Sequence, residues 1–171
     1  WIVKTNSGNV FSTPNVIIAG GVGSFEPRKF SVKDCEKFEN KSIFYSVKDK
    51  KLFEGKTISI FGGGDSALDW AVELSKNSKV NLIHRRDDFR AARATVDKIN
   101  QLAKEGKINL FTKFQMTAIK GENKLGSVDI KSDDKETKTL KTDYVLGFFG
   151  LIMQLGPIAN WGLNIDKKTI E

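Results

Sequence analysis

Two short stretches of the sequence combine residue types that bind phosphate groups. The first is Gly62-Gly63-Gly64-Asp65-Ser66-Ala67, which follows the β-prone segment 57–61 and precedes a segment of helical periodicity. It fits the pattern G-x-G-x-x-A, in which the first glycine allows a tight turn, the second lets a pyrophosphate approach the backbone and the alanine lets the helix pack closely. The N–H groups of the helix N-terminus would face the phosphates. This stretch predicts a dinucleotide site, and a purely structural turn is the alternative.

Two polar residues of this turn have different expected roles. The carboxylate of Asp65 would repel a phosphate, so we expect Asp65 to cap the N-terminus of the helix. The neutral hydroxyl of Ser66 is the better donor to a phosphate oxygen.

The second stretch lies where the next strand of such a fold ends. In NAD sites, an Asp or Glu about 20 residues past the glycines accepts a hydrogen bond from the ribose 2′-OH. Here that region holds His84, followed by Arg85, Arg86 and Arg90. Guanidinium groups bind a 2′-phosphate through paired hydrogen bonds, so the exchange of an acid for arginines predicts NADP rather than NAD.

An exposed arginine-rich loop balanced by Asp87 and Asp88 is the alternative explanation of this stretch. The position of the stretch favours the phosphate site, because the adenosine ribose of a bound dinucleotide must lie at the end of this strand. His84 is the only histidine of the chain, and we expect its N–H groups to complete the site. The residues around it do not support a general-base role, and no catalytic residue or metal site is predicted.

The spacing of apolar residues places both stretches in an α/β fold. Strands are predicted at 57–61, 79–83, 108–112 and 143–149, and helices after Gly64 and over 91–104. Their alternation predicts βαβ units and a Rossmann-like parallel sheet with helices on both faces. Three further runs predict a small antiparallel β-meander over this sheet, at 115–120, 127–131 and 137–141.

The chain divides into four expected segments. Residues 1–30 contain a predicted hairpin, a buried strand at 16–19 and a glycine-rich hinge. Residues 31–55 are predicted to form a connector with one short helix. Residues 56–155 form the predicted NADP(H)-binding domain, and residues 156–171 form the last segment.

The composition bears on nucleic-acid binding, on the cellular compartment and on membrane insertion. The chain has 28 Lys and Arg against 21 Asp and Glu, but no nucleic-acid-binding motif accompanies the charge of +7, which also suits an acidic protein partner. The single cysteine, Cys35, indicates a reducing compartment, so we expect a cytoplasmic protein. The longest apolar run, 144–153, is too short to span a membrane. The missing initiator Met indicates a piece of a longer protein.

The motif GGGDSA followed by HRRDDFRA resembles the NADPH-binding domain of the thioredoxin-reductase-like flavoproteins. The resemblance implies a pyrophosphate cradle from Gly63 to Ser66 and a turn near the nicotinamide at Gly150. It also implies that the 2′-phosphate and adenine are surrounded by His84, Arg85, Arg86 and Arg90. The stretch VIIAGGVG is similar to the family's crossing from the FAD domain into the NADPH domain. The resemblance therefore implies that residues 1–30 end a segment of an FAD domain and that residues 156–171 return towards that domain.

One departure from that family bears on the electron acceptor. Thioredoxin reductases of this type carry Cys-x-x-Cys within the NADPH domain, and this chain has Cys35 alone. No dithiol of the chain can take electrons from a flavin, so disulfide reduction by that route is excluded. The stretches FYSVKD, GGGDSALDWA and GLIMQLGPIANWGL resemble instead the second, thioredoxin-reductase-like type of ferredoxin–NADP reductase.

This second resemblance implies a homodimeric flavoprotein that passes electrons between NADPH and ferredoxin through FAD. The chain lacks the family's FAD-domain glycine fingerprint and its flavin-contacting Gly-Asp motif. We therefore expect this piece to bind NADP(H) but not FAD, and to be inactive alone. The alternatives are another flavoprotein of the family with a different electron acceptor, and a non-catalytic NADP-binding module.

Overall fold

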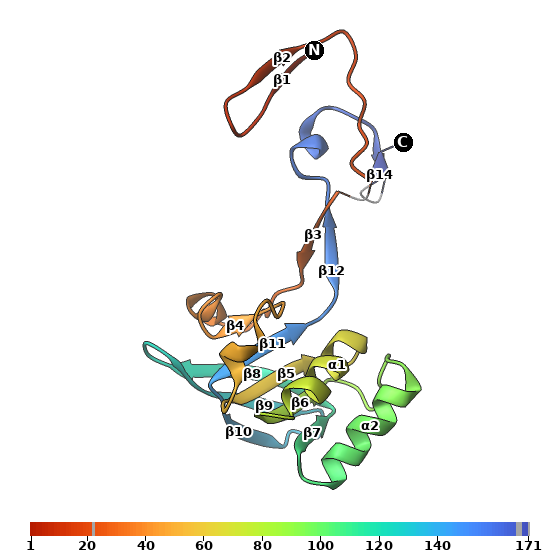
Figure 1. The fold of residues 1–171 in the computed structure, drawn as a ribbon. Helices are drawn as coiled ribbons and strands as arrows, with labels where there is room; N and C mark the ends of the chain where they lie inside the picture. The colour runs from red at the N-terminus through yellow and green to blue at the C-terminus, as the bar shows by residue number, and fades with distance from the viewer. Residues whose placement is uncertain (22, 167–168, 171) are drawn as a thin grey trace. The chain divides into compact units, whose positions relative to one another are not determined.

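A computed structural model describes residues 1–171 except 22, 167, 168 and 171 (Figure 1). The chain forms two compact units. One runs from Pro27 to Leu151, and the other combines Trp1–Glu26 with Ile152–Glu171. Both stretches that the sequence predicts to bind phosphate lie in the first unit.

Five parallel strands form the central sheet of the unit Pro27–Leu151, in the order β4-β11-β5-β6-β7. They are β4 (Ile43–Phe44), β5 (Thr57–Gly62), β6 (Lys79–His84), β7 (Ile108–Thr112) and β11 (Tyr144–Phe148). The inner strands β5, β6 and β11 are largely buried apolar runs, as expected of parallel strands that are covered on both faces. The predicted Rossmann-like parallel sheet is confirmed, with β4 as an additional edge strand.

Both α-helices pack on the same face of this sheet. Helix α1 (Asp65–Leu74) lies against β5 and β6, and α2 (Arg93–Lys104) lies against β7 and contacts α1 (Figure 1). Leu68 of α1 and Ile99 of α2 are fully buried in the core between the helices and the sheet. Their burial follows from the apolar stripe at helical spacing that each sequence carries.

The opposite face is covered by antiparallel strands, so the prediction of helices on both faces is wrong in that detail. The covering strands are β8 (Phe114–Gly121), β9 (Leu125–Ser132) and β10 (Thr137–Lys141), in the order β10-β9-β8. Their core residues Val128 and Ile130 cluster with Phe61 and Ile83 of the parallel sheet. Lys113, in a left-handed conformation with φ 63°, is the one residue between β7 and β8. The chain therefore reverses at once, and no crossover helix can form there.

Residues 31–55, which were predicted to be a connector, contribute to this same unit. They form the short helices η1 (Cys35–Phe38) and η2 (Lys50–Phe53) as well as the strand β4. Phe38 is buried on the meander side of the sheet and Phe53 on the helix side. The segment therefore covers the edge of the sheet next to β11.

The second unit consists of short strands. They are β1 (Ile2–Lys4), β2 (Val10–Ser12), β3 (Ser24–Pro27), β12 (Leu151–Gln154), β13 (Ile165–Asp166) and β14 (Thr169–Ile170), with the 3-10 helix η3 (Gly156–Asn160). The predicted hairpin is confirmed as the pair β1-β2. The buried strand predicted at 16–19 is wrong, because no described segment pairs with it and Ile17 is 91% exposed. An apolar run becomes a buried strand only where neighbouring backbone and side chains cover it.

Replacement of a core residue of β5 tests this packing. Ile60 lies in the middle of the strand and is fully buried. We expect Ile60→Ala to lower the free energy of unfolding by about 2–5 kcal/mol, through lost burial and the cavity that remains. Leu52→Ala, at a residue that is 43% exposed, is the control and should change it by less than about 0.5 kcal/mol. Equal effects of the two changes on denaturant unfolding would contradict the assigned core.

Candidate nucleotide-binding site

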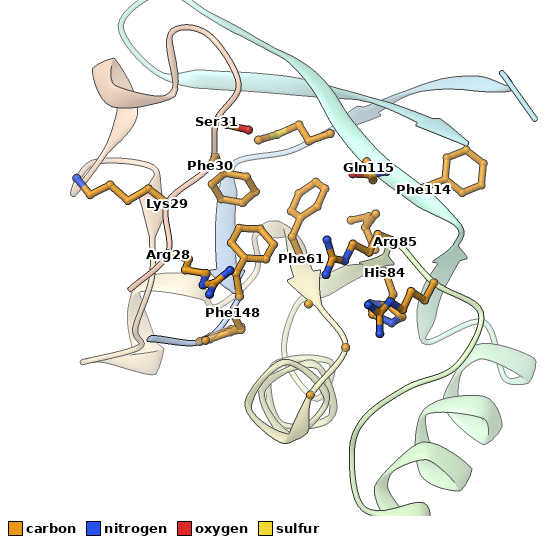
Figure 2. A pocket seen from close by; sticks show the side chains of 18 of the residues that line it. Arg28, Lys29, Phe30, Ser31, Phe61, His84, Arg85, Phe114, Gln115 and Phe148 are labelled. Carbon is orange, nitrogen blue, oxygen red and sulfur yellow. The ribbon is translucent and has the colours of Figure 1, made fainter. Parts of the chain in front are cut away.

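A cavity of about 600 Å³ opens at the carboxyl ends of the central strands (Figure 2). It is lined by residues 28–32, 61–64, 83–86, 90, 114–116 and 148–150. The chain runs from β5 outward through β6 to β7, whereas β11 lies on the other side of β5. The cavity therefore lies where the strand order reverses, which is the place where open α/β sheets bind ligands.

The three glycines after β5 differ in how much room they leave for a side chain. A Cβ on Gly62 would lie 2.7 Å from the Ala67 Cβ and 2.7 Å from the Phe148 carbonyl oxygen. A Cβ on Gly63 would lie 2.1 Å from Cε1 of His84. A Cβ on Gly64 would lie 3.9 Å from the Arg90 carbonyl oxygen, which is an ordinary van der Waals distance. The first two glycines bring strand, helix and His84 together, and the third lines the cavity without a steric need for glycine.

The start of helix α1 differs from the prediction in one respect. Gly64 is the N-cap residue and its carbonyl accepts the first helical hydrogen bonds, so the prediction that Asp65 caps the helix is wrong. The Asp65 carboxylate instead accepts from the backbone N–H of Ala92, at 2.8 Å, which ties α1 to the segment before α2. Asp65, Ser66 and Ala67 do not line the cavity; Ser66 is exposed and Ala67 is buried beneath Gly62. The N–H groups of Asp65 and Ser66 precede the first intrahelical donor.

Residues 85–90 follow β6 and form a loop, which we call the arginine loop. Backbone contacts hold this loop on both sides. The N–H of Arg90 donates to the Gly63 carbonyl at 2.7 Å, and the N–H of Lys113 donates to the Arg86 carbonyl at 3.3 Å. On its inner side, Nε2 of His84 lies 3.0 Å from the Asp88 carbonyl. These contacts attach the loop to the glycine turn, to β6 and to the start of the meander. The three arginines of the loop line the cavity from this scaffold.

The arginines that line the cavity have no acidic partner among the described residues. Every salt bridge among the described residues uses a lysine, and none involves Arg28, Arg85, Arg86 or Arg90. Asp87 pairs with Lys113 at 2.8 Å and not with an arginine, and this contact lowers the pKa of the Asp87 carboxyl. A cluster of guanidinium groups without carboxylate partners is suited to an anionic ligand.

His84 is built into the wall of the cavity. Its side chain is 9% exposed, and its ring stacks on Phe89 with 5.1 Å between centroids. Burial lowers the pKa of His84, and the positive charges of the neighbouring arginines lower it further. A neutral imidazole has one N–H, and here the carbonyl of Asp88 accepts from it. The structure thus differs from the expectation that its N–H groups face a phosphate, because that hydrogen bond secures the loop instead.

The β11 side of the cavity contains residues that sequence reasoning missed. Gly150 lines it as predicted, and its carbonyl accepts from the N–H of Arg28 at 3.0 Å. Phe30 packs edge-on against Phe61 and Phe149, with centroids 5.3 and 4.8 Å apart. Residues 28–30 precede both motifs in the sequence and have no glycine or charge pattern that marks them. Residues 114–116 of the meander also line the cavity, and their alternating pattern indicated only a strand.

The described part of the chain lacks what a metal site or a membrane-spanning helix requires. No group of three or more His, Cys, Asp or Glu side chains gathers there in a way that could hold a metal ion. The described helices include none that is long and apolar enough to cross a membrane.

The sheet, the glycine turn at the reversal of strand order and the arginine loop define a Rossmann-like α/β domain of the dinucleotide-binding type. Residues 1–171 match the model of the pyridine nucleotide-disulphide oxidoreductase family, and the chain belongs to this family. It is 67% identical over 170 residues to a ferredoxin–NADP reductase of Pelagibacter ubique, covering 99% of this chain and 50% of that protein. It is 47% identical to ferredoxin–NADP reductase 1 of Christiangramia forsetii, covering 100% of this chain and 49% of that protein.

Solved structures show the same architecture. Thioredoxin reductase of Lactococcus lactis matches with a TM-score of 0.75 at 26% identity, over 86% of this chain and 49% of that one. Thioredoxin reductase of T. acidophilum matches with a TM-score of 0.73 at 27% identity, over 85% of this chain and 48% of that one. The chain spans about half the length of the relatives that it matches.

The depressed pKa of His84 predicts a pH dependence of stability. The unfolded chain takes up this proton near pH 6.5, whereas the folded chain takes it up only at lower pH. The stabilising effect is therefore complete above about pH 6.5 and is lost as the pH falls below that value. We expect the free energy of unfolding to fall more between pH 7.5 and 5.5 in the unchanged chain than in His84→Gln. Because His84 is the only histidine of the chain, equal losses in both proteins would contradict this assignment.

Proposed function

We propose that the cavity binds NADP(H). The arginine loop carries this proposal: Arg85, Arg86 and Arg90 line the cavity at the end of β6, and none of them has an acidic partner among the described residues. A 2′-phosphate carries nearly two negative charges and accepts paired hydrogen bonds from guanidinium groups. The end of β6 lacks the acid that would bind the 2′-OH of NAD.

The glycine turn suits the pyrophosphate of the same ligand. Gly62, Gly63 and Gly64 line the cavity next to the arginine loop, and the N–H groups of Asp65 and Ser66 lie at the start of α1, ahead of the first intrahelical donor. Helix N-termini attract phosphates through these N–H groups and the partial positive charge of the helix. We assign Gly150, after β11, to the neighbourhood of the nicotinamide, because β11 lies on the side of β5 away from the arginine loop.

We further propose that the full-length protein is a ferredoxin–NADP reductase. FAD would accept or return a hydride at the nicotinamide and exchange single electrons with ferredoxin. The residues of this chain would bind and orient NADP(H), which requires no acid or base from the cavity. Because the chain spans about half the length of its relatives, we assign FAD binding chiefly to the remaining half. Residues 1–30 and 156–171 would then belong to the FAD domain, and 56–155 to the NADP(H) domain.

Ferredoxin is the proposed electron partner for three reasons. The relatives at 67% and 47% identity are named for it. The one cysteine, Cys35, is 1% exposed, and burial raises the pKa of its thiol to about 11, so it is poorly suited to redox exchange. The net charge of +7 suits an acidic partner protein. We infer a cytoplasmic homodimer, in keeping with the lone reduced cysteine and with the resemblance to this type of reductase.

The proposed preference for NADP over NAD predicts the effect of replacing Arg85. Arg85→Ala should weaken NADPH binding by about 2 kcal/mol, which is the loss of hydrogen bonds to a charged group, and should leave NADH binding nearly unchanged. Arg93→Ala is the matched control, since Arg93 is exposed at the start of α2 and does not line the cavity. Calorimetric titration of the chain with both nucleotides measures the effect. Equal affinity of the unchanged chain for NADPH and NADH would rule out the 2′-phosphate site.

The proposal that ferredoxin accepts the electrons is tested with the full-length protein. Loaded with FAD and supplied with NADPH, it should reduce ferredoxin, and the rate should fall with rising salt because opposite charges bring the partners together. A good rate with a small quinone and none with ferredoxin would instead favour a flavoprotein of the same family with another acceptor.

A further inference from the structure

Arg28 belongs to the cavity although it lies outside both sequence motifs. Its backbone N–H donates to the carbonyl of Gly150 at 3.0 Å, which fixes it beside the end of β11. Two residues later, Phe30 packs against Phe61 and Phe149, and a Cβ on Gly147 would lie 2.8 Å from the Phe30 ring. The backbone that carries Arg28 is therefore held on both sides by packing and hydrogen bonding.

Arg28 and the arginine loop lie on opposite sides of β5. The loop follows β6, whereas Arg28 is attached to the residue after β11, and β5 lies between these strands. Figure 2 shows Arg28 and Arg85 approaching the cavity from opposite sides of Phe61. The glycine turn that ends β5 lies between the two cationic groups.

The charge of Arg28 is free to meet a ligand. No described Asp or Glu forms a salt bridge with it. Its neighbour Lys29 differs in this respect, since Nζ of Lys29 lies 2.5 Å from the Glu39 carboxylate. Of these two adjacent cations that line the cavity, Arg28 alone is left without a carboxylate partner.

We propose that Arg28 binds the phosphate of the nicotinamide mononucleotide half of NADP(H). This inference rests on the proposed NADP(H) function. With the 2′-phosphate at the arginine loop and the pyrophosphate at the glycine turn, the nicotinamide half must extend towards β11, where Arg28 lies. The two phosphates of the pyrophosphate then have different partners: the adenosine phosphate lies at the start of α1 and the other phosphate faces Arg28.

A comparison of two ligands isolates this contact. The nucleotide 2′,5′-ADP carries the 2′-phosphate and the adenosine 5′-phosphate but lacks the nicotinamide half. Arg28→Ala should therefore weaken NADPH binding by about tenfold or more and change 2′,5′-ADP binding by less than about twofold. Lys33→Ala is the control, because Lys33 is an exposed cation of the same segment that does not line the cavity, and both affinities should stay within about twofold of the unchanged chain.

Calorimetric titration of the three proteins with both ligands gives the test, and thermal unfolding checks that each variant is folded. Selective loss of NADPH affinity in Arg28→Ala supports the proposal. Unchanged NADPH affinity, or equal loss for both ligands, overturns it while leaving the NADP(H) site intact. Failure of the unchanged chain to bind 2′,5′-ADP would overturn the proposed function itself.

Discussion

The contact between the glycine turn and the loop after β6 determines the shape of the cavity. The Gly63 carbonyl accepts from the N–H of Arg90, and the imidazole of His84 occupies the space that a side chain at residue 63 would need. His84 in turn holds the Asp88 carbonyl and stacks on Phe89. A side chain at position 63 would displace the imidazole, and the loop that presents the arginines would lose its inner support. The glycine turn and the arginine loop therefore form one structural unit.

The same arrangement explains how uncompensated positive charge is tolerated. Arginines held near one another repel, and an isolated loop would spread to separate them. Here the restraint comes from backbone hydrogen bonds and from the pair Asp87–Lys113, which leave the guanidinium groups unengaged. The acids next to this site stabilise the loop and α1 rather than neutralise the arginines, as the contact of Asp65 with the Ala92 N–H also shows. A site organised in this way loses less conformational entropy when an anion binds.

The sequence pattern predicted those parts of the fold and the site that depend on residues close together in the chain. The β5 run followed by glycines, the helical stripe of α1 and the histidine and arginines at the end of β6 were predicted from spacing, because neighbouring strands of a parallel sheet end at the same edge. The meander at 115–141 was predicted from its alternating runs, but the single-residue link at Lys113, which leaves the second face of the sheet to these strands and not to a helix, carries no clear sequence signal. Burial of residues 16–19 depended on partners that the described chain does not supply. Arg28 reaches the cavity only through tertiary contacts with Gly150 and the aromatic residues, so no motif could reveal it.

The claim that the arginine loop receives a 2′-phosphate is tested most directly by phosphorus NMR of NADP⁺ bound to this chain. The 2′-phosphate is a monoester with a second pKa near 6, and guanidinium groups favour its dianion. We expect its resonance to titrate at distinctly lower pH in the complex than in the free nucleotide, and this shift to shrink in Arg85→Ala. A 2′-phosphate that titrates in the complex as it does in free NADP⁺ would contradict the account.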